Sequence, residues 1–215
     1  MHIVDLSHPL TTGMPVFPGD PEVTIRDAAT LDADGFRVMR VHMGSHSGTH
    51  IDAPSHFIDA GVAIDQVTLD HFVSPATVVP LSGISADTAI GEDSFADLDI
   101  TGRIVVLHTG WDRYWGTDHY AHHPFVSEGA ARLLVKAGVK AVAIDAFSVD
   151  PTHLTDHDFP AHMVLLGAGI PIAENVRGID RITWDNPVVS LLPLRLDGCD
   201  GAPVRAVAWQ SDSGH

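Results

Sequence analysis

The sequence predicts a single α/β domain, and three segments in its middle carry this prediction. Residues 103–108 form a run of branched apolar side chains, which is typical of a buried strand. Ser127 precedes a helical stretch that reaches Ala137, and Gly138 follows in the position where helices commonly stop. Residues 141–145 indicate another strand. Strand and helix therefore alternate here, which is the order typical of α/β folds.

The composition supports one globular domain over residues 1–215. Of the 215 residues, 45% are hydrophobic and only 19% are charged, so the chain can bury a sizeable core. Its formal net charge of -16 argues against nucleic acid or an anionic membrane as a partner. No apolar run approaches about 18 residues, and the amino terminus lacks the regions of a signal peptide. We therefore expect a cytoplasmic protein, and its single cysteine, Cys199, provides no disulfide framework.

The first forty residues indicate short strands interrupted by a covering loop. Residues 3–6, 23–25 and 36–43 are predicted strands, because β-branched and large apolar side chains are frequent in them. Residues 11–21 are rich in Pro and Gly and cannot form a helix or an inner strand. This loop carries Phe17, and it either walls a substrate pocket or packs on the core.

Less regular segments flank the middle of the chain. Residues 65–72 and 85–98 are each predicted to hold a short helix. Residues 109–116 are rich in aromatic residues and glycine directly after a strand, as a pocket-lining loop would be. Residues 188–196 and 204–209 are predicted to form a terminal hairpin.

One acidic residue stands out near the end of an apolar region. A short apolar helix is predicted over residues 161–167 and carries His162, and a brief strand beyond it ends in Glu174. A carboxylate at the end of an apolar run is costly unless it is paired or bound to a cation. The alternative is an ordinary salt bridge from Glu174 to Arg177 or Arg181.

The stretch over residues 46–56 has the composition of a metal site. It contains His46, His50, Asp52 and His56, with no Lys or Arg among them. Imidazole nitrogen and carboxylate oxygen suit zinc, and also manganese, iron or nickel, whereas the lack of Cys argues against a closed structural zinc site. A His-rich surface loop is the alternative.

The spacing predicts that this stretch is a curled loop. A straight strand would separate its ends by roughly 33 Å, too far for one metal. Gly44, Gly48 and Pro54 all oppose a helix. Gly48 permits a positive φ and Pro54 turns the chain again, so that His56 can fold back. A short extended piece at His50–Asp52 would point both of its polar side chains the same way.

With this motif, His-x-Gly-Thr-His-x-Asp-x-Pro-x-His, the sequence resembles the metal-dependent cyclase-like hydrolase family. That family includes bacterial-type kynurenine formamidases (arylformamidases) and isatin hydrolases. The resemblance implies a mixed, barrel-like sheet flanked by helices, and homodimers or larger assemblies such as tetramers. The likeness extends over nearly the whole chain, at residues 5–7, 18–20, 109–111, 138–142, 148–151, 192–194 and 203–207.

The resemblance also implies which residues would hold metal. His46 and His50 would bind one metal, and Asp52 would bridge two. His162 would hold the second metal, and Glu174 would touch both. One or two divalent metals per subunit are therefore expected, with zinc first and manganese as the alternative.

The expected chemistry is hydrolysis of a small-molecule amide by a metal-bound hydroxide. A divalent metal lowers the pKa of its bound water towards neutrality and stabilises the developing oxyanion. The resemblance makes His56 the acid/base group, which could accept the proton of that water and pass it to the leaving nitrogen. Phe17 stands where formamidases of the family carry a Trp that walls the substrate.

Because an aryl amine leaves more readily than an alkyl amine, the expected substrate is N-formylkynurenine or a related aryl formamide. Ring opening of an isatin-like or other cyclic amide is the alternative, and Phe17 with the aromatic loop would suit either. A metal-dependent cyclase or dehydratase and a non-catalytic metal-binding protein are two further alternatives. An open coordination position would favour an enzyme.

Overall fold

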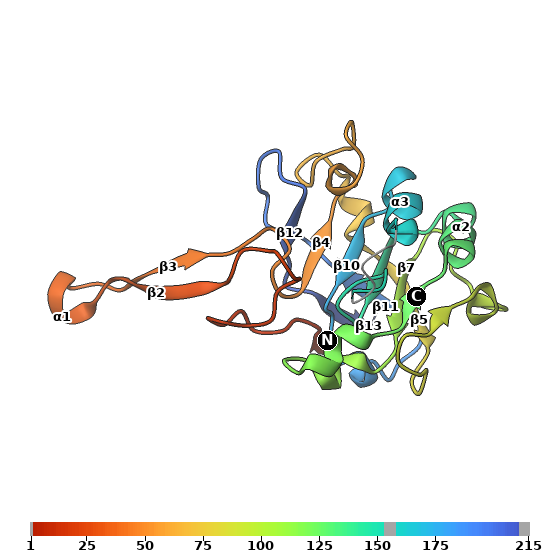
Figure 1. The fold of residues 1–215 in the computed structure, drawn as a ribbon, viewed down its shortest axis with the longest axis horizontal. Coiled ribbons are helices and arrows are strands. Elements are labelled where there is room, and N and C mark those ends of the chain that lie inside the picture. The colour runs from red at the N-terminus through yellow and green to blue at the C-terminus, as the bar shows by residue number, and fades with distance from the viewer. Residues whose placement is uncertain (1, 153–157, 211–215) are drawn as a thin grey trace.

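A mixed nine-stranded sheet with helices against one face forms the body of the protein in the computed structural model, which describes residues 2–152 and 158–210 (Figure 1). The α-helices are α1 (Leu31–Asp34), α2 (Glu128–Ala137) and α3 (Pro160–Gly167). The strands are β1 (Ile3–Asp5), β2 (Thr24–Ala29), β3 (Val38–His42), β4 (His50–Asp52), β5 (Val73–Pro80), β6 (Ala89–Ile90), β7 (Ile104–His108), β8 (Phe125–Val126), β9 (Ala141–Ile144), β10 (Ile172–Glu174), β11 (Pro187–Ser190), β12 (Gly201–Pro203) and β13 (Val207–Gln210).

The strand order explains why the sheet is mixed. The order is β1-β13-β11-β5-β7-β9-β10-β4-β12. The central strands β5, β7, β9 and β10 run parallel, and α2 and α3 lie in the connections that lead from β7 to β9 and from β9 to β10. The other pairings of the nine-stranded sheet are antiparallel, and the separate pair β6–β8 is parallel. The α/β class and the mixed sheet predicted from the sequence are confirmed.

Alternating side chains divide the sheet between two apolar cores. In β7, Val105 and Leu107 belong to the core that includes α2 and α3, whereas Ile104 and Val106 belong to the other core. This is the two-residue period of a strand buried on both faces. The same alternation holds in the short strands β4 and β10, where it decides which side chains face α3.

The sheet curls into a half-barrel around the second core. The strands at its two ends, β1 and β12, both contribute side chains to that core, through Val4 and Ala202. The Oγ of Ser7, just after β1, donates to the carbonyl of Val204, just after β12, at 3.1 Å. Two edges of an open sheet can meet in this way only if the sheet is strongly curved.

Three expected elements differ from the structure. Within residues 65–72 only Leu69–His71 is helical, as a single 3-10 turn, and within residues 85–98 the helical part is the 3-10 turn Glu92–Phe95. Both segments hold β-branched or turn-forming residues that weaken longer helices. The terminal strands β11 and β13 do pair antiparallel, but β12 lies between them in the chain and pairs with β4 instead. A local hairpin pattern could not reveal that excursion.

Strands β2 and β3 form a hairpin arm that extends away from the body, with α1 at its tip (Figure 1). Thr30 caps α1 and Gly35 ends it in a left-handed conformation. Every residue of β3 is exposed. Among residues 2–152 and 158–210, no further layer of the chain covers β3, and isolated two-stranded hairpins are marginally stable in water.

No helix among residues 2–152 and 158–210 is both long and apolar enough to cross a membrane.

The predicted capping of α2 is present: the Oγ of Ser127 accepts a hydrogen bond from the backbone N–H of Ala130 at 3.2 Å, and Gly138 follows the helix in a left-handed conformation.

Ser127→Ala should lower the free energy of unfolding by about 1 kcal/mol, because it removes the cap from the first turn of α2. Urea unfolding followed by circular dichroism measures this change. Ser127→Asp should keep most of the stability, since a carboxylate also caps a helix. An unchanged urea midpoint for the alanine variant would show that the cap contributes nothing.

Candidate metal centre

The centre is built on one face of two paired strands. Glu174 of β10 lies directly opposite His50 of β4, and Ile172 lies opposite Asp52. Because Ile51 and Ala173 point into the core inside the half-barrel, the two-residue period sends His50, Asp52 and Glu174 to the opposite face, towards α3.

The loop before β4 and the turn after it bring two more histidines to this face. Residues between β3 and β4 form a loop in which Gly48 has a φ of +64°, and Pro54–His56 is a single 3-10 turn that carries His56 back. The curled geometry and the extended piece expected from the sequence are both found. Gly201 of β12 leaves room for His46, because a Cβ there would lie 2.7 Å from its Cε1 atom.

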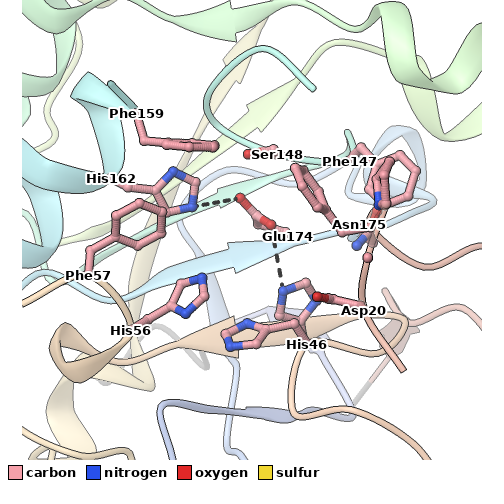
Figure 2. A pocket seen from close by; sticks show the side chains of 14 residues that line it. Asp20, His46, His56, Phe57, Phe147, Ser148, Phe159, His162, Glu174 and Asn175 are labelled. Atoms are coloured by element: carbon pink, nitrogen blue, oxygen red, sulfur yellow. Dashed lines mark ion pairs between the residues drawn. The ribbon is translucent and has the colours of Figure 1, made fainter. Parts of the chain in front are cut away.

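The polar side chains form a cage around a small volume. Asp52 Oδ1 lies 2.7 Å from His46 Nδ1 and 3.3 Å from His50 Nε2. His162, which α3 contributes, places Nε2 3.6 Å from Asp52 Oδ2 and 3.4 Å from Glu174 Oε1. Glu174 Oε2 lies 3.6 Å from His50 Nε2, and Figure 2 marks the ion pair between Glu174 and His162 with a dashed line. The five residues that the resemblance implied as ligands therefore converge.

Each imidazole of the cage is fixed from outside by its other ring nitrogen. His50 Nδ1 donates to the carbonyl of Gly48 at 2.8 Å, so its Nε2 is the nitrogen left for the cage. His162 Nδ1 donates to Asp150 at 2.7 Å, and His46 Nε2 donates to Asp200 at 3.0 Å. Metal-ligating histidines commonly donate their second ring proton to a carbonyl or carboxylate in this way.

Asp150 has a second function, which explains why α3 presents His162 at this angle. Its carboxylate also accepts hydrogen bonds from the backbone N–H groups of Ala161 and His162, at 3.0 and 2.9 Å. A carboxylate at a helix N-terminus satisfies N–H groups that lack partners within the helix. One buried side chain thus anchors both the helix and the imidazole.

The cage concentrates opposite charges away from water. Burial alone would lower the pKa of His46, but Asp52 and Asp200 outweigh it and raise that pKa to about 10. Burial likewise opposes the charged form of His162, yet Asp150, Asp52 and Glu174 raise its pKa well above the usual value. Burial would raise the pKa of Asp52, but His46 and its other imidazole neighbours hold it well below the usual range.

A cation can replace the protons that balance these carboxylates. Asp52 Oδ2 is a buried oxygen that accepts no hydrogen bond from any residue that the structure describes. Such an atom is costly unless something binds it. Two triads have ligand atoms within 4.8 Å of one another, namely His46, Asp52 and His56, and His50, Asp52 and Glu174. Nitrogen and carboxylate oxygen together suit a divalent transition metal.

His56 lies at the rim of the cage. Its ring stacks on His46 with centroids 3.9 Å apart, and its Nδ1 is 3.4 Å from Asp200 Oδ2. Burial lowers its pKa, and together with His46 and His162 it outweighs the carboxylates of Asp52 and Glu174, which act in the opposite direction. A ring that is neutral near pH 7 and only partly buried can accept a proton from a group in the pocket.

The cage forms the floor of a cavity of about 390 Å³. Phe17 lines it, as one of the two sequence interpretations of its loop required, and its ring meets that of Phe147 edge-on at 6.0 Å. Phe57 and Phe159 line the cavity from the side of α3 (Figure 2). The aromatic residues create an apolar slot above a polar floor, the usual construction of a small-molecule site.

Residues 109–116, expected to form a pocket-lining loop, do not line this cavity, although Gly110, Asp112, Arg113 and Trp115 line another one. Trp111 is buried in the core, and Trp115 stacks on His8 with centroids 4.1 Å apart. This loop follows β7, whereas the cage is built on β10 and β4, which lie beyond β9 in the sheet order. The alternative salt bridge from Glu174 to an arginine is also not found, because Glu174 contacts His50, His162 and the N–H of Val149.

Sequence reasoning missed the two carboxylates that hold imidazoles from outside. Asp150 ends an apolar stretch just as Glu174 does, so the same rule about costly carboxylates could have found it. Asp200 lies in a turn-like segment near Cys199, with no local signal. It reaches His46 only because β12 pairs with β4.

Comparison with known proteins places this arrangement in a class of metal-dependent hydrolases. Residues 4–151 match the family model described as a putative cyclase. A kynurenine formamidase from Geobacillus thermodenitrificans is 34% identical over 206 residues, covering 94% of this chain and 95% of that protein. A solved structure described as a potential metal-dependent hydrolase with cyclase activity is 30% identical and superposes with a TM-score of 0.80, covering 96% of each chain.

Isatin hydrolase A from Labrenzia aggregata shares the fold, with a TM-score of 0.87, 23% identity and coverage of 96% of this chain and 93% of that one. The chain belongs to the cyclase family. It is an α/β member with a mixed sheet, as the motif over residues 46–56 indicated.

Gly201→Ala should weaken metal binding about tenfold or more, because the new Cβ would displace His46 and overpacking costs about 1–3 kcal/mol. A Cβ at this position would also lie 2.9 Å from the carbonyl oxygen of Ile51. Titration with zinc against a competing chelator measures the affinity.

Gly91→Ala is the matched control, since Gly91 has a φ of -88° and no atom lies within 4 Å of a Cβ there. Unchanged zinc affinity in Gly201→Ala would contradict the position given to His46.

Proposed function

We propose that this protein is a metal-dependent amide hydrolase of the arylformamidase type, acting on N-formylkynurenine or a related aryl formamide. The observation that carries the proposal is the cage of imidazoles and carboxylates beneath an aromatic slot. Full-length relatives named kynurenine formamidase support the choice of substrate. The single domain over residues 1–215 and the cytoplasmic location, both expected from the sequence, stay predictions.

The proposed ligands are the five residues of the cage. His46 and His50 would hold one metal, Asp52 would bridge two, His162 would hold the second, and Glu174 would touch both. Their donor sets suit zinc or manganese. The unpartnered Asp52 Oδ2 and the outward hydrogen bonds of His46, His50 and His162 support this assignment.

When bound, a divalent metal supplies an activated water and polarises the amide carbonyl. The chain supplies the remaining functions. His56, proposed as the acid/base, can take a proton in the pocket and return it to the leaving aryl nitrogen. Phe17 and Phe147 would hold the aryl ring, and Phe57 and Phe159 keep bulk water from one side of the cavity.

Purified protein should contain one or two equivalents of divalent metal and should deformylate N-formylkynurenine in a chelator-sensitive manner. Elemental analysis and the absorbance of released kynurenine measure the two quantities. Bound metal without deformylation, together with ring opening of isatin, would transfer the proposal to cyclic amides. Protein that binds no divalent metal at any supplied concentration would refute it.

His56→Ala should reduce kcat about 10²- to 10⁴-fold while leaving the metal content unchanged, because the change removes a proton carrier but no proposed ligand. His119→Ala is the control, since His119 is exposed and packs on Trp111 and Tyr114 outside the cage. Metal loss in His56→Ala would instead place His56 among the ligands, as its proximity to His46 and Asp52 permits.

We further propose that two or more copies of this chain associate through the hairpin arm. Met39 and Val41 of β3 share one exposed face, and Ile25 of β2 lies opposite Val41. Arg26 and Arg40 lie directly across from each other, which is unfavourable unless acidic groups approach them. A second copy offers such groups, since the chain has a formal net charge of -16.

Light scattering should show an assembly larger than a 23.0 kDa monomer, and the double variant Met39→Asp and Val41→Asp should shift it towards the monomer. Leu69→Asp, at an apolar side chain of the body that is more exposed than Met39 and Val41, should leave the mass unchanged. A monomeric wild-type protein at micromolar concentration would refute the association.

A further inference from the structure

Asp20 is an acidic side chain of the pocket that the proposed chemistry does not use. It ends the turn over residues 17–20, in which its backbone N–H donates to the carbonyl of Phe17 at 2.9 Å. Gly19 has a φ of +103°, a conformation that glycine adopts readily. Asp20 lines the cavity, on the side of Phe147 and Asn175 and across from His56 in Figure 2.

The carboxylate of Asp20 is free, unlike those of the cage. Within residues 2–152 and 158–210 no hydrogen bond or ion pair involves its side chain, although the residue is only partly exposed. By contrast, Asp52 and Glu174 both lie against imidazoles. The residues that line the cavity also include no Lys or Arg. Asp20 is therefore a carboxylate that lines the cavity with no Lys or Arg in that lining to pair with, while the raised-pKa imidazoles His46 and His162 already lie against Asp52, Asp200 and Asp150.

The neighbours of Asp20 define where its ligand would lie. Phe17 stands three residues earlier in the same turn, and its ring forms the aromatic wall with Phe147. An aryl group held at this wall would share the cavity with the Asp20 side chain. A half-buried carboxylate prefers a group that donates hydrogen bonds and carries positive charge.

We propose that Asp20 binds a primary ammonium group of the substrate, so that the site selects aryl formamides carrying an aliphatic amine over neutral aryl or cyclic amides. This inference rests on the proposed function and narrows its substrate class. N-formylkynurenine has both parts, an aryl formamide and an ammonium on its side chain. Isatin carries no ammonium group, so Asp20 would not contribute to its binding.

Two other uses of Asp20 lead to different outcomes. If Asp20 acted as a proton acceptor, its loss would lower kcat/KM for every substrate alike. If it pairs with an ammonium group, its loss would lower kcat/KM only for substrates that carry this charge. As a metal ligand its loss would lower metal content. The groups of described residues that could hold a metal do not include it. Substrate dependence therefore separates the three possibilities.

The experiment compares metal-loaded wild-type protein with Asp20→Asn, which keeps the size of the side chain and removes its charge. Two substrates are used: N-formylkynurenine and a neutral 2-formamidophenyl alkyl ketone that lacks the amino-acid end. Calorimetry with kynurenine, the ammonium-bearing product, measures binding independently of turnover. Asp59→Asn is the matched control, because Asp59 is an exposed carboxylate on the loop that follows Phe57.

Asp20→Asn should lower kcat/KM for N-formylkynurenine about tenfold, mainly through KM, and weaken kynurenine binding by a similar factor. It should change kcat/KM for the neutral ketone less than about twofold. Asp59→Asn should leave all three quantities near wild type, and metal content should be equal in all proteins.

Equal losses on both substrates, lost metal, or unchanged kynurenine binding would each overturn the inference. Failure of the proposed function has a different signature, namely wild-type protein that deformylates neither substrate. In that case the calorimetry still decides on Asp20, because tighter binding of kynurenine by wild type than by Asp20→Asn requires no turnover.

Discussion

The antiparallel pairing of β4 with β10 is the constraint on which the centre depends. It sets His50 opposite Glu174 and turns Asp52 to the same face, while Ile51 and Ala173 close the core behind them. Because the period of a strand is two, a slip of one residue would send the polar side chains into the apolar interior. Hydrophobic burial thus fixes the register of the two strands, and this register sets the positions of His50, Asp52 and Glu174.

The elements around this pair of strands position the remaining histidines of the cage and hold them by hydrogen bonds. The N-terminus of α3 delivers His162, and Asp150 holds both that helix and that ring. On the other side β12 brings Asp200 to His46 and supplies a glycine where a side chain would collide. The buried imidazoles of His46, His50 and His162 are tolerated here because each meets a carboxylate inside the cage and a carboxylate or carbonyl outside it, and these contacts offset the cost of desolvation.

The substrate space is made by loops above this rigid base. The walls come from the turn over residues 17–20, from Phe57 after the 3-10 turn, and from residues near the ends of β9 and α3. A centre on strands with specificity on loops lets the chemistry stay fixed while the preferred amide changes. This arrangement is consistent with one fold that includes relatives named for different amide substrates.

The sequence by itself determined the features that depend on local physics. The alternation of strand and helix, the caps of α2 and the curled metal stretch over residues 46–56 follow from periodicity, capping and the special conformations of Gly and Pro. Glu174 could be singled out because a carboxylate in an apolar run needs a partner wherever it lies.

Only the tertiary structure decided which distant residues meet. Asp200, more than 150 positions beyond His46, carries no local signal, and the aromatic walls come from Phe147 and Phe159 instead of the aromatic loop after β7. The reason is the sheet order: which loops surround a centre depends on which strands are neighbours, and those pairings join residues far apart in the chain.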